Sequence, residues 1–227
     1  MTPFATFYDR AIARHGEDVL RSRFPRVASA DELKALSDDR YLAAMAKRVF
    51  AAGFRWKVIE AKWDGFEAAF HGFDPGWVAD LEIDGVAELS QDTRIVRNRP
   101  KILATIDNAA FIQEVAADHG SFGAWIAAWP TDDTVGLWAE LKARGNRLGG
   151  DTGAWVLRLV GRDTFRLSGD VVATMVDAGV VSKKPTGKGD LARTQQAFNA
   201  WTAESGLSQG AVSVVLACSI GEVYVGR

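Results

Sequence analysis

The sequence predicts an all-α protein with two helical lobes and a cleft between them. Apolar residues recur at helical spacing through most of the chain, as at Leu42, Met45 and Val49. Start and stop signals separate these helical stretches. Strand signals are few, and the main one is the C-terminal segment 222–227.

Three local signals set expected helix boundaries. Ser29 and Glu32 have the spacing of a capping box, in which each side chain bonds the backbone of the other residue. Pro75 follows Asp74 and fits the first position of a helix, where a missing N–H costs nothing. Gly145 is expected to end the helix before it.

The chain is expected to fold as two lobes whose residues are not contiguous. Residues 1–35 together with 131–227 flank the middle block 36–130, so we assign the flanking segments to one lobe and the block to the other. Residues 181–190, rich in Pro, Gly and Lys, are expected to form an exposed loop.

Composition narrows the class of protein. The chain has 227 residues, 48% hydrophobic and 25% charged, enough to bury a substantial core. No apolar run reaches the ~18 residues of a membrane span, and charges interrupt the N-terminus before a signal-peptide core. A single cysteine, Cys218, precludes an internal disulfide and agrees with a cytoplasmic location. The three histidines lie far apart, so we expect no metal site.

Basic residues gather in two stretches although the formal net charge is only −2. One stretch is TRIVRNRPK (93–101), and the other runs from Lys142 through Arg144 to Arg147. Either stretch could be an ordinary solvated helix face or one basic surface of a nucleic-acid-binding protein.

The middle block carries four short motifs in a fixed order. They are residues 52–56 (AGFRW), 70–75 (FHGFDP), 95–102 (IVRNRPKI) and 108–109 (NA). In these motifs the chain resembles the DNA-3-methyladenine glycosylase I family, and the similarity extends over about residues 45–155. The resemblance implies a helical fold, base excision from DNA, and a base-stacking role for Trp56.

The third block is similar to the wider superfamily of helix-hairpin-helix DNA glycosylases. The glycine-rich turn 148–154 (LGGDTGA) is followed by an aspartate in 167–172 (LSGDVV). The resemblance implies that the turn grips a DNA phosphate with backbone amides at a helix N-terminus. A plain helix-to-helix connection is the alternative. The DNA-binding residues implied are Arg147, Gly149, Gly150, Gly153, Lys142 and Arg144.

Asp170 is the residue that the superfamily pattern assigns to catalysis. Breaking an N-glycosidic bond builds positive charge on the deoxyribose, and a carboxylate beside the sugar stabilises that charge and can orient water. Asp170 could instead be a helix N-cap, since aspartate is favoured there.

A flipped base needs a flat apolar face, for which Trp56 is the leading candidate and Tyr8 a weaker one. The other tryptophans that we expect to pack in the core are Trp63, Trp77, Trp125, Trp129, Trp138 and Trp155.

The sequence departs from the glycosylase I pattern at two points. Arg48 stands where the family has the glutamate that contacts the methylated base, so a cationic lesion would be repelled unless Glu60 or Glu67 turns into the pocket. The family's zinc ligands have no counterparts, so we expect no cofactor. Binding of a monovalent ion at the hairpin is left as an open alternative.

Thr152 occupies the position where bifunctional superfamily members carry a nucleophilic lysine. We therefore expect a monofunctional, monomeric DNA glycosylase that acts on double-stranded DNA with a damaged base, for which an alkylated base is one candidate. Two alternatives stay open: a catalytically inactive lesion sensor of the same fold, and a helical scaffold that binds proteins.

Overall fold

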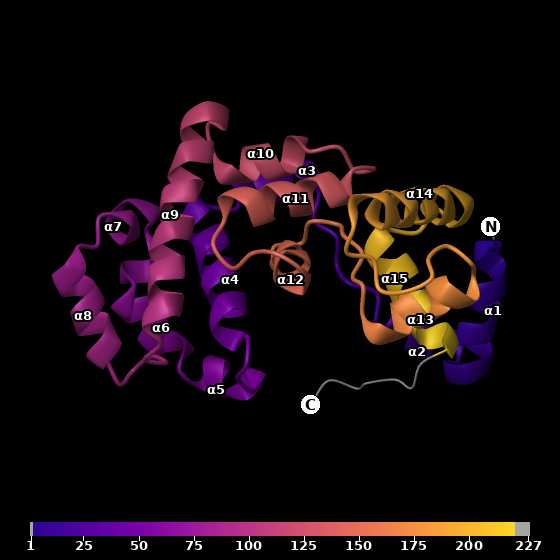
Figure 1. The fold of residues 1–227 in the computed structure, drawn as a ribbon, viewed down its shortest axis with the longest axis horizontal. Coiled ribbons are helices and arrows are strands. Elements are labelled where there is room, and N and C mark those ends of the chain that lie inside the picture. Colours follow the sequence, from indigo (N-terminus) through magenta and orange to yellow (C-terminus); the bar gives the residue numbers. More distant parts are fainter. Residues whose placement is uncertain (1, 221–227) are drawn as a thin grey trace. The chain divides into compact units, whose positions relative to one another are not determined.

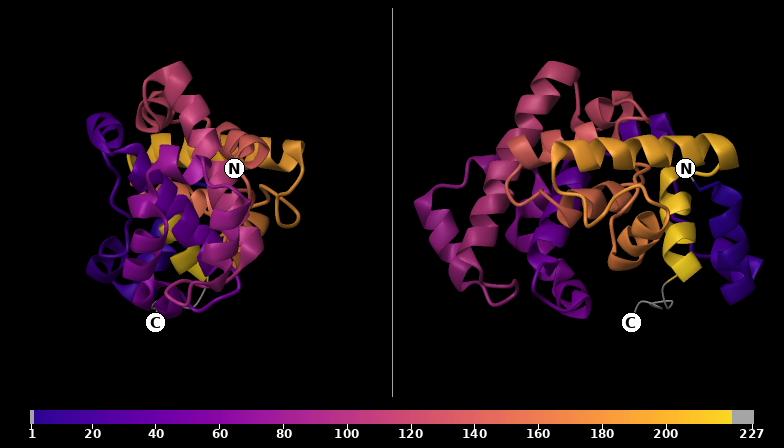
Figure 2. Two further views of the ribbon diagram at one scale, coloured as in Figure 1. Left: turned by 90° about the vertical axis from the view of Figure 1, so that its left-hand side faces the viewer. Right: turned by 45° about the vertical axis from the view of Figure 1, so that its right-hand side comes forward.

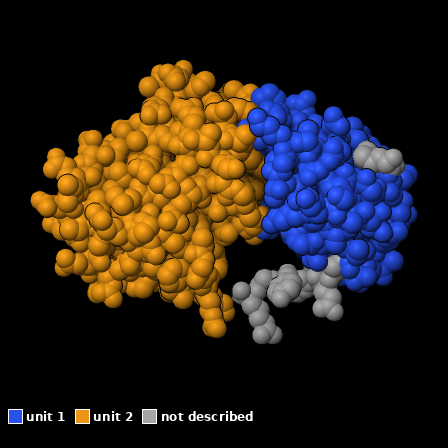
Figure 3. All heavy atoms as spheres, viewed as in Figure 1, with its two compact units in different colours: residues 1–27, 130–136, 163–227 blue, residues 28–129, 137–162 orange. Residues whose placement is uncertain are grey.

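The computed structural model describes residues 2–220, and all regular elements within that range are helices. The all-α prediction is therefore confirmed. The expected strand at 222–227 lies outside the described residues. The chain divides into two compact units, which Figure 3 colours separately. Unit 1 comprises residues 1–27, 130–136 and 163–227, and unit 2 comprises residues 28–129 and 137–162.

Unit 1 is built around α15 (Gln209–Ile220), which packs against the four other helices described in the unit (Figures 1 and 2). Its core contains stacked Phe165 and Phe198 rings with centroids 4.0 Å apart. Buried apolar faces of this kind hold a small helical unit together. The other helices are α1 (Phe4–His15), α2 (Glu17–Arg21), α13 (Gly169–Asp177) and α14 (Lys188–Ser205).

Unit 2 is centred on α4 (Asp38–Ala51) and the long α9 (Arg99–His119), which pack against each other (Figure 1). The predicted apolar stripe on α4 is fully buried, with Leu42, Met45 and Val49 at 2% exposure or less. The remaining elements are α3 (Ala30–Ala35), α5 (Trp56–Ala61), α6 (Trp63–Ala69), η1 (His71–Phe73), α7 (Pro75–Ala79), α8 (Ile83–Gln91), α10 (Phe122–Ala128), α12 (Asp151–Leu159) and α11 (Thr134–Arg144), of which residues 137–144 belong to this unit.

The predicted helix boundaries are confirmed. Ser29 and Glu32 form the complete capping box at the start of α3. The Asp74 carboxylate accepts from the Trp77 amide, and Pro75 is the first residue of α7. The α11 helix ends at Arg144, and the Gly145 amide bonds the Leu141 carbonyl.

The division into units differs from the expected one at residues 137–162, and also at residues 28–35, which belong to unit 2. Residues 137–162, which include the glycine-rich turn, belong with 28–129 because α12 packs against α4 and the Ala28 amide bonds the Gly161 carbonyl. The turn and Asp170 are therefore in different units. The expected loop 181–190 is shorter than predicted, since α14 already begins at Lys188. The predicted cleft stays a prediction.

Among the described residues no single helix has both the length and the apolar character of a membrane span. The helices α14 and α15 meet that criterion only when joined, and they are bent by 97° at their junction.

Candidate functional site

The glycine-rich turn joins α11 to α12 through residues 145–150. Gly150 is the N-cap of α12, with φ 62° and ψ −135°, a backbone conformation that only glycine adopts readily. Gly153 lies inside α12, where an added Cβ would stand 2.5 Å from the Leu148 carbonyl oxygen. The two glycines thus allow a sharp turn that packs closely on the first turn of its own helix.

Asn108 fixes this turn to α9. Its side-chain oxygen accepts from the Asn146 amide at 2.8 Å, and its side-chain nitrogen donates to the Asn146 carbonyl at 3.1 Å. The Asn146 side chain in turn donates to Asp107 at 2.6 Å. Asn108 is fully buried, so these bonds satisfy polar groups that water does not reach.

The predicted cations around the turn differ in their exposure and in their contacts with other side chains. Lys142 and Arg147 are exposed, and Arg147 has a left-handed φ of 61°. Arg144 lies 3.6 Å from Glu114, and its guanidinium lies 4.9 Å from the Phe111 ring centroid. Asp151 adds a negative charge to the first turn of α12. An anion would thus gain more from Arg147 and Lys142 than from the helix end itself.

Trp56, the first residue of α5, is half-buried and lies beside two cations of α4. The Lys47 Nζ lies 5.2 Å from the Trp56 ring centroid, and the Arg48 Cζ lies 5.3 Å from it. The Arg48 Cζ is also 4.6 Å from the centroid of Trp155 on α12. Both contacts are within cation–π range. We call Trp56, Trp155, Lys47 and Arg48 the indole cluster.

Glu67 interacts with Arg40 and Trp63. Its two carboxylate oxygens accept from the Arg40 guanidinium at 2.8 and 3.0 Å, and one of them also accepts from Trp63 Nε1 at 2.9 Å. These bonds raise the pKa of Arg40. Glu60 is exposed on α5. Glu67 therefore does not supply the pocket glutamate that the family pattern has.

Lys101 holds the segment that leads to Trp56. Its Nζ donates to the Phe50 carbonyl at 3.0 Å and to the Ala52 carbonyl at 2.5 Å, at the end of α4. It also lies 4.7 Å from the Phe54 ring centroid. Burial, and secondarily the Arg147 charge, lower the pKa of Lys101. One lysine of α9 thus positions the chain just before the indole cluster.

Asp170 is the second residue of α13 in unit 1, and it is half-buried. The N-cap of this helix is Ser168, whose hydroxyl accepts from the Val171 amide. The alternative that Asp170 is the N-cap is therefore wrong. Within the described residues its carboxylate makes no hydrogen bond or ion pair, so both oxygens are available to an outside group.

Tyr8 also lies in unit 1, on α1, where its hydroxyl donates to Glu17 at 3.2 Å. Burial and this hydrogen bond raise the pKa of Tyr8. The Arg21 guanidinium lies 6.0 Å from the Tyr8 ring centroid. Nothing in the described structure assigns Tyr8 to a base, and its role stays a prediction.

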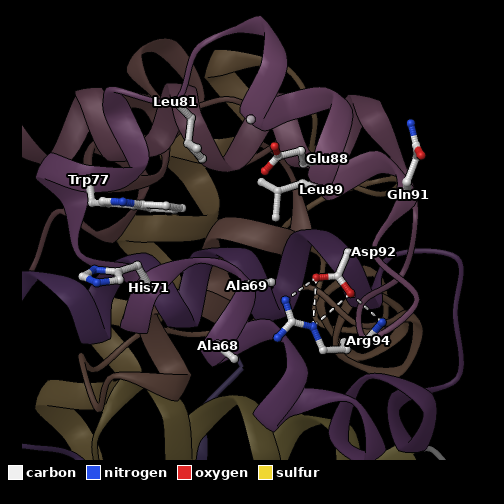
Figure 4. Close-up of a pocket in the computed structure, with 11 residues that line it drawn as sticks. Ala68, Ala69, His71, Trp77, Leu81, Glu88, Leu89, Gln91, Asp92 and Arg94 are labelled. Atoms are coloured by element: carbon white, nitrogen blue, oxygen red, sulfur yellow. Dashed lines mark hydrogen bonds and ion pairs between the residues drawn. The ribbon is translucent and has the colours of Figure 1, made fainter.

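A separate groove of about 580 Å³ lies in unit 2 between η1, α7 and α8 (Figure 4). His71 stacks on Trp77 at one end, with ring centroids 5.2 Å apart, and the Asp92–Arg94 ion pair lies at the other. Trp77 is 40% exposed, so its assignment to the core is wrong. The predicted site residues are not among those that line this groove.

Comparisons with known proteins agree with this architecture. Residues 34–145 match the family model for methyladenine glycosylase. Over these residues the chain is similar to the methyladenine glycosylase family. It is 43% identical over 63 residues to DNA-3-methyladenine glycosylase 1 of Escherichia coli (strain K12), which covers 27% of this chain. The match spans about a third (34%) of that relative's length.

Solved structures share the fold. The 3-methyladenine DNA glycosylase I of Staphylococcus aureus aligns with a TM-score of 0.51 at 21% identity, over 67% of this chain and 92% of that one. An 8-oxoguanine glycosylase/lyase of Methanocaldococcus jannaschii, solved with DNA containing 8-oxoguanine, aligns with a TM-score of 0.50 at 10% identity, over 92% and 93%. At these identities the likeness establishes the all-helical fold.

Sequence reasoning missed three contributors to the site. Lys47 and Trp155 complete the indole cluster, and Trp155 is half-buried rather than a core residue. Asn146 closes the bond to Asn108, which the motif analysis included without a role. Among residues 2–220 no group of three His, Cys, Asp or Glu side chains could hold a metal ion.

Proposed function

We propose that this chain is a monofunctional DNA glycosylase, which hydrolyses the bond between a damaged base and its deoxyribose in double-stranded DNA. The observation that carries the proposal is the family match over residues 34–145, since that segment contains Trp56, Lys101 and Asn108.

The chemistry assigns distinct tasks to the two units. Arg147, Lys142 and the Gly149–Gly150 turn of unit 2 hold phosphates, and Trp56 receives the extruded base by stacking. Asp170 of unit 1 has an available carboxylate for stabilising the sugar cation and orienting water. Thr152, on α12, cannot form a Schiff base, so the product would be an intact abasic site.

Three further features belong to the proposal. The protein works as a cytoplasmic monomer, it needs no resident metal, and its partner is DNA with a damaged base. The single cysteine is typical of a protein of the reducing cytoplasm, which supports the proposed location.

The experiment is release of free base from duplexes that carry single defined lesions, followed by chromatography of the bases. Asp170→Asn should lower the release rate at least about 100-fold, as removal of one electrostatic stabiliser does, while DNA affinity is kept. Asp177→Asn is the matched control, because Asp177 is on the same helix but is exposed and paired with Arg10 at 3.1 Å. Strand cleavage should appear only after alkali treatment.

A second function is favoured by the two cations at Trp56, which differ from the family's pocket glutamate. In that case the chain binds damaged DNA without excising a base. Wild-type protein that binds lesion-containing duplexes but releases no base from any of them would establish this sensor and overturn the enzyme.

A further inference from the structure

The groove between η1, α7 and α8 in unit 2 has an open apolar lining (Figure 4). Trp77 is 40% exposed at one end of it, and His71 stacks on this indole with ring centroids 5.2 Å apart. Ala68, Leu81 and Leu89 belong to the same lining. A volume of about 580 Å³ is typical of ligand sites, and an exposed indole among apolar side chains is a preferred point of contact for a binding partner.

The end of the groove that carries His71 is held in place by the protein itself. His71, Gly72 and Phe73 all have left-handed φ values, of 50°, 67° and 62°. Residues other than glycine keep such a backbone only where the surrounding structure fixes it. Arg40 donates to the Gly72 carbonyl at 2.7 Å, and the Phe73 side chain is fully buried. The stack of His71 on Trp77 is therefore formed before any partner binds, which lowers the entropy cost of binding.

The groove has an uncompensated negative charge. Among the described residues that line it, Arg94 is the one lysine or arginine, and it donates to both Asp92 carboxylate oxygens at 2.7 to 3.1 Å. These bonds lower the pKa of Asp92. Lys62 is not a lining residue, and its Nζ donates to the Thr93 carbonyl at 2.7 Å. Glu88 lines the groove from α8 and makes no hydrogen bond or ion pair within residues 2–220.

Further carboxylates continue this negative surface along α8. Asp84 precedes Glu88 by one helical turn, at roughly 5–6 Å between Cβ atoms, so the two like charges repel each other. Asp80 and Glu82 precede the helix and are also exposed. In the whole segment 72–93 there are six acidic residues and no lysine or arginine. A cationic group bound here would relieve the repulsion along the helix.

This surface is opposite in charge to the surface proposed for DNA. The helices α7 and α8 pack against α9, whereas α12 packs against α4, and Figure 1 shows α7 and α8 on the side of α9 that faces away from α12. DNA phosphates are attracted by Arg147 and Lys142 at the glycine-rich turn and are repelled by the carboxylates of α8. The groove therefore suits a cationic partner and not a nucleic acid.

We propose that this groove docks a short basic peptide segment of a protein partner, in which an apolar side chain lies against Trp77 and a lysine or arginine pairs with Glu88. The spacing of the carboxylates favours a peptide. A chain with several cations can meet Asp84 and Glu88 together, whereas a small cation with one charge meets one of them. The long stems of lysine and arginine also pack well along an indole. The docking does not depend on base excision, since the proposed DNA-binding and catalytic residues do not line the groove.

The first test measures binding of three probes to the full chain by NMR, through the backbone amide signals of Gly85 and Leu89 in the groove. The probes are the peptide acetyl-LKRLKK-amide, the peptide acetyl-SKRSKK-amide, which has serine in place of leucine, and spermidine. We expect the leucine peptide to bind at least about 3-fold more tightly than either other probe, because it alone combines multiple cations with apolar side chains. Its affinity should fall as salt is added, because exposed charge pairs are screened.

The second test uses variants of the groove. Glu88→Gln and Trp77→Ala should each weaken binding of the leucine peptide about 2- to 5-fold, as the loss of one exposed ion pair or one exposed aromatic contact does. Far-ultraviolet circular dichroism shows whether each variant is folded, and Glu88→Gln decides the test where Trp77→Ala does not fold. Glu60→Gln is the matched control. It removes the same charge from an exposed glutamate of α5, outside the groove, so the affinity should stay at the wild-type value.

Weaker binding in both groove variants, with Glu60→Gln unchanged, supports the inference. Peptide binding by a chain that releases no base from any damaged duplex overturns the proposed function and supports the inference. Equal affinity for the two peptides shows charge attraction alone and overturns the inference, and so does spermidine that binds as tightly as the leucine peptide. A DNA duplex that displaces the peptide, or amide signals of Gly85 and Leu89 that none of the probes shifts, also overturns it.

Discussion

Asn108 and Asn146 hydrogen-bond each other in both directions, side chain to backbone amide at 2.8 Å and side chain to backbone carbonyl at 3.1 Å. The pair joins the middle of the longest helix to the loop that precedes Arg147 and the glycine turn. A buried side chain thereby sets the position of an exposed surface. The family motif residue Asn108 acts as a positioning residue for the proposed DNA contact.

Asn108→Ala should destabilise the protein and weaken DNA binding together. The substitution leaves the Asn146 amide and carbonyl without their partner in a buried place, which costs about 1–3 kcal/mol. Urea unfolding and fluorescence anisotropy with a labelled duplex measure the two effects. Asp107→Asn, which changes only the exposed bond to the Asn146 side chain, should do much less. Unchanged DNA affinity in a destabilised Asn108→Ala protein would show that the pair is structural only.

Gly150→Ala should damage the turn although space for a methyl group is available there. The cost comes from φ 62° with ψ −135°, which a residue with a Cβ adopts only at about 1–3 kcal/mol of strain. Gly149→Ala is the comparison, since Gly149 does not have a positive φ and its added Cβ would meet the flexible Lys142 side chain at 3.1 Å. Thermal unfolding of the two variants should therefore rank Gly150→Ala as the less stable. The reverse ranking would contradict the turn geometry.

Arg147→Gln should lower the magnitude of the logarithmic salt slope of DNA binding by about one, whatever the sequence of the duplex. Arg144→Gln should change the slope less, because Arg144 is held by Glu114 and the Phe111 ring. Asp151→Asn should have the opposite effect on affinity to Arg147→Gln. It should tighten DNA binding, because it removes a negative charge at the same turn. Anisotropy titrations over a range of salt concentrations provide all three slopes. Equal slopes in wild type and Arg147→Gln would remove Arg147 from the interface.

Much of the helical fold was predictable because its signals are local. The capping box at Ser29 and the Asp74–Pro75 start each depend on residues within one helical turn, so the sequence alone determines them. The division into units was not predictable in the same way. It depends on which helix α12 packs against, and helical periodicity shows that a face is apolar without naming its partner.

The candidate site was predicted in part for the same reason. Trp56 and Arg48 were found through a motif and a fixed offset from it, but Trp155 comes from a helix about a hundred residues later and joins them only in the folded chain. Trp77 looked like a core residue because it follows an apolar pattern, yet it stacks on exposed His71. Ser168 and Asp170 are both residue types that cap helices, so the sequence alone did not decide between them. In the structure Ser168 is the N-cap.

Lys101 should make the stability of the protein depend on alkaline pH. Its pKa in the folded protein is below the usual 10.5, chiefly because of burial, so the unfolded chain holds the proton more tightly. The contribution of this group is therefore fully present above pH 10.5 and is lost as the pH falls through the lowered pKa. Lys101→Met removes this dependence and also leaves the Phe50 and Ala52 carbonyls without their donor, at a cost of about 1–3 kcal/mol.

The measurement is urea unfolding of wild type and Lys101→Met at neutral pH and near pH 10, because the difference between the two proteins cancels the titration of all other groups. That difference should grow with pH. Lys34→Met removes an exposed lysine of α3 and should show a difference that is small at both pH values. A difference for Lys101→Met that shrinks as the pH rises would mean that the charged ammonium stabilises the end of α4, and that burial is not the dominant influence on its proton.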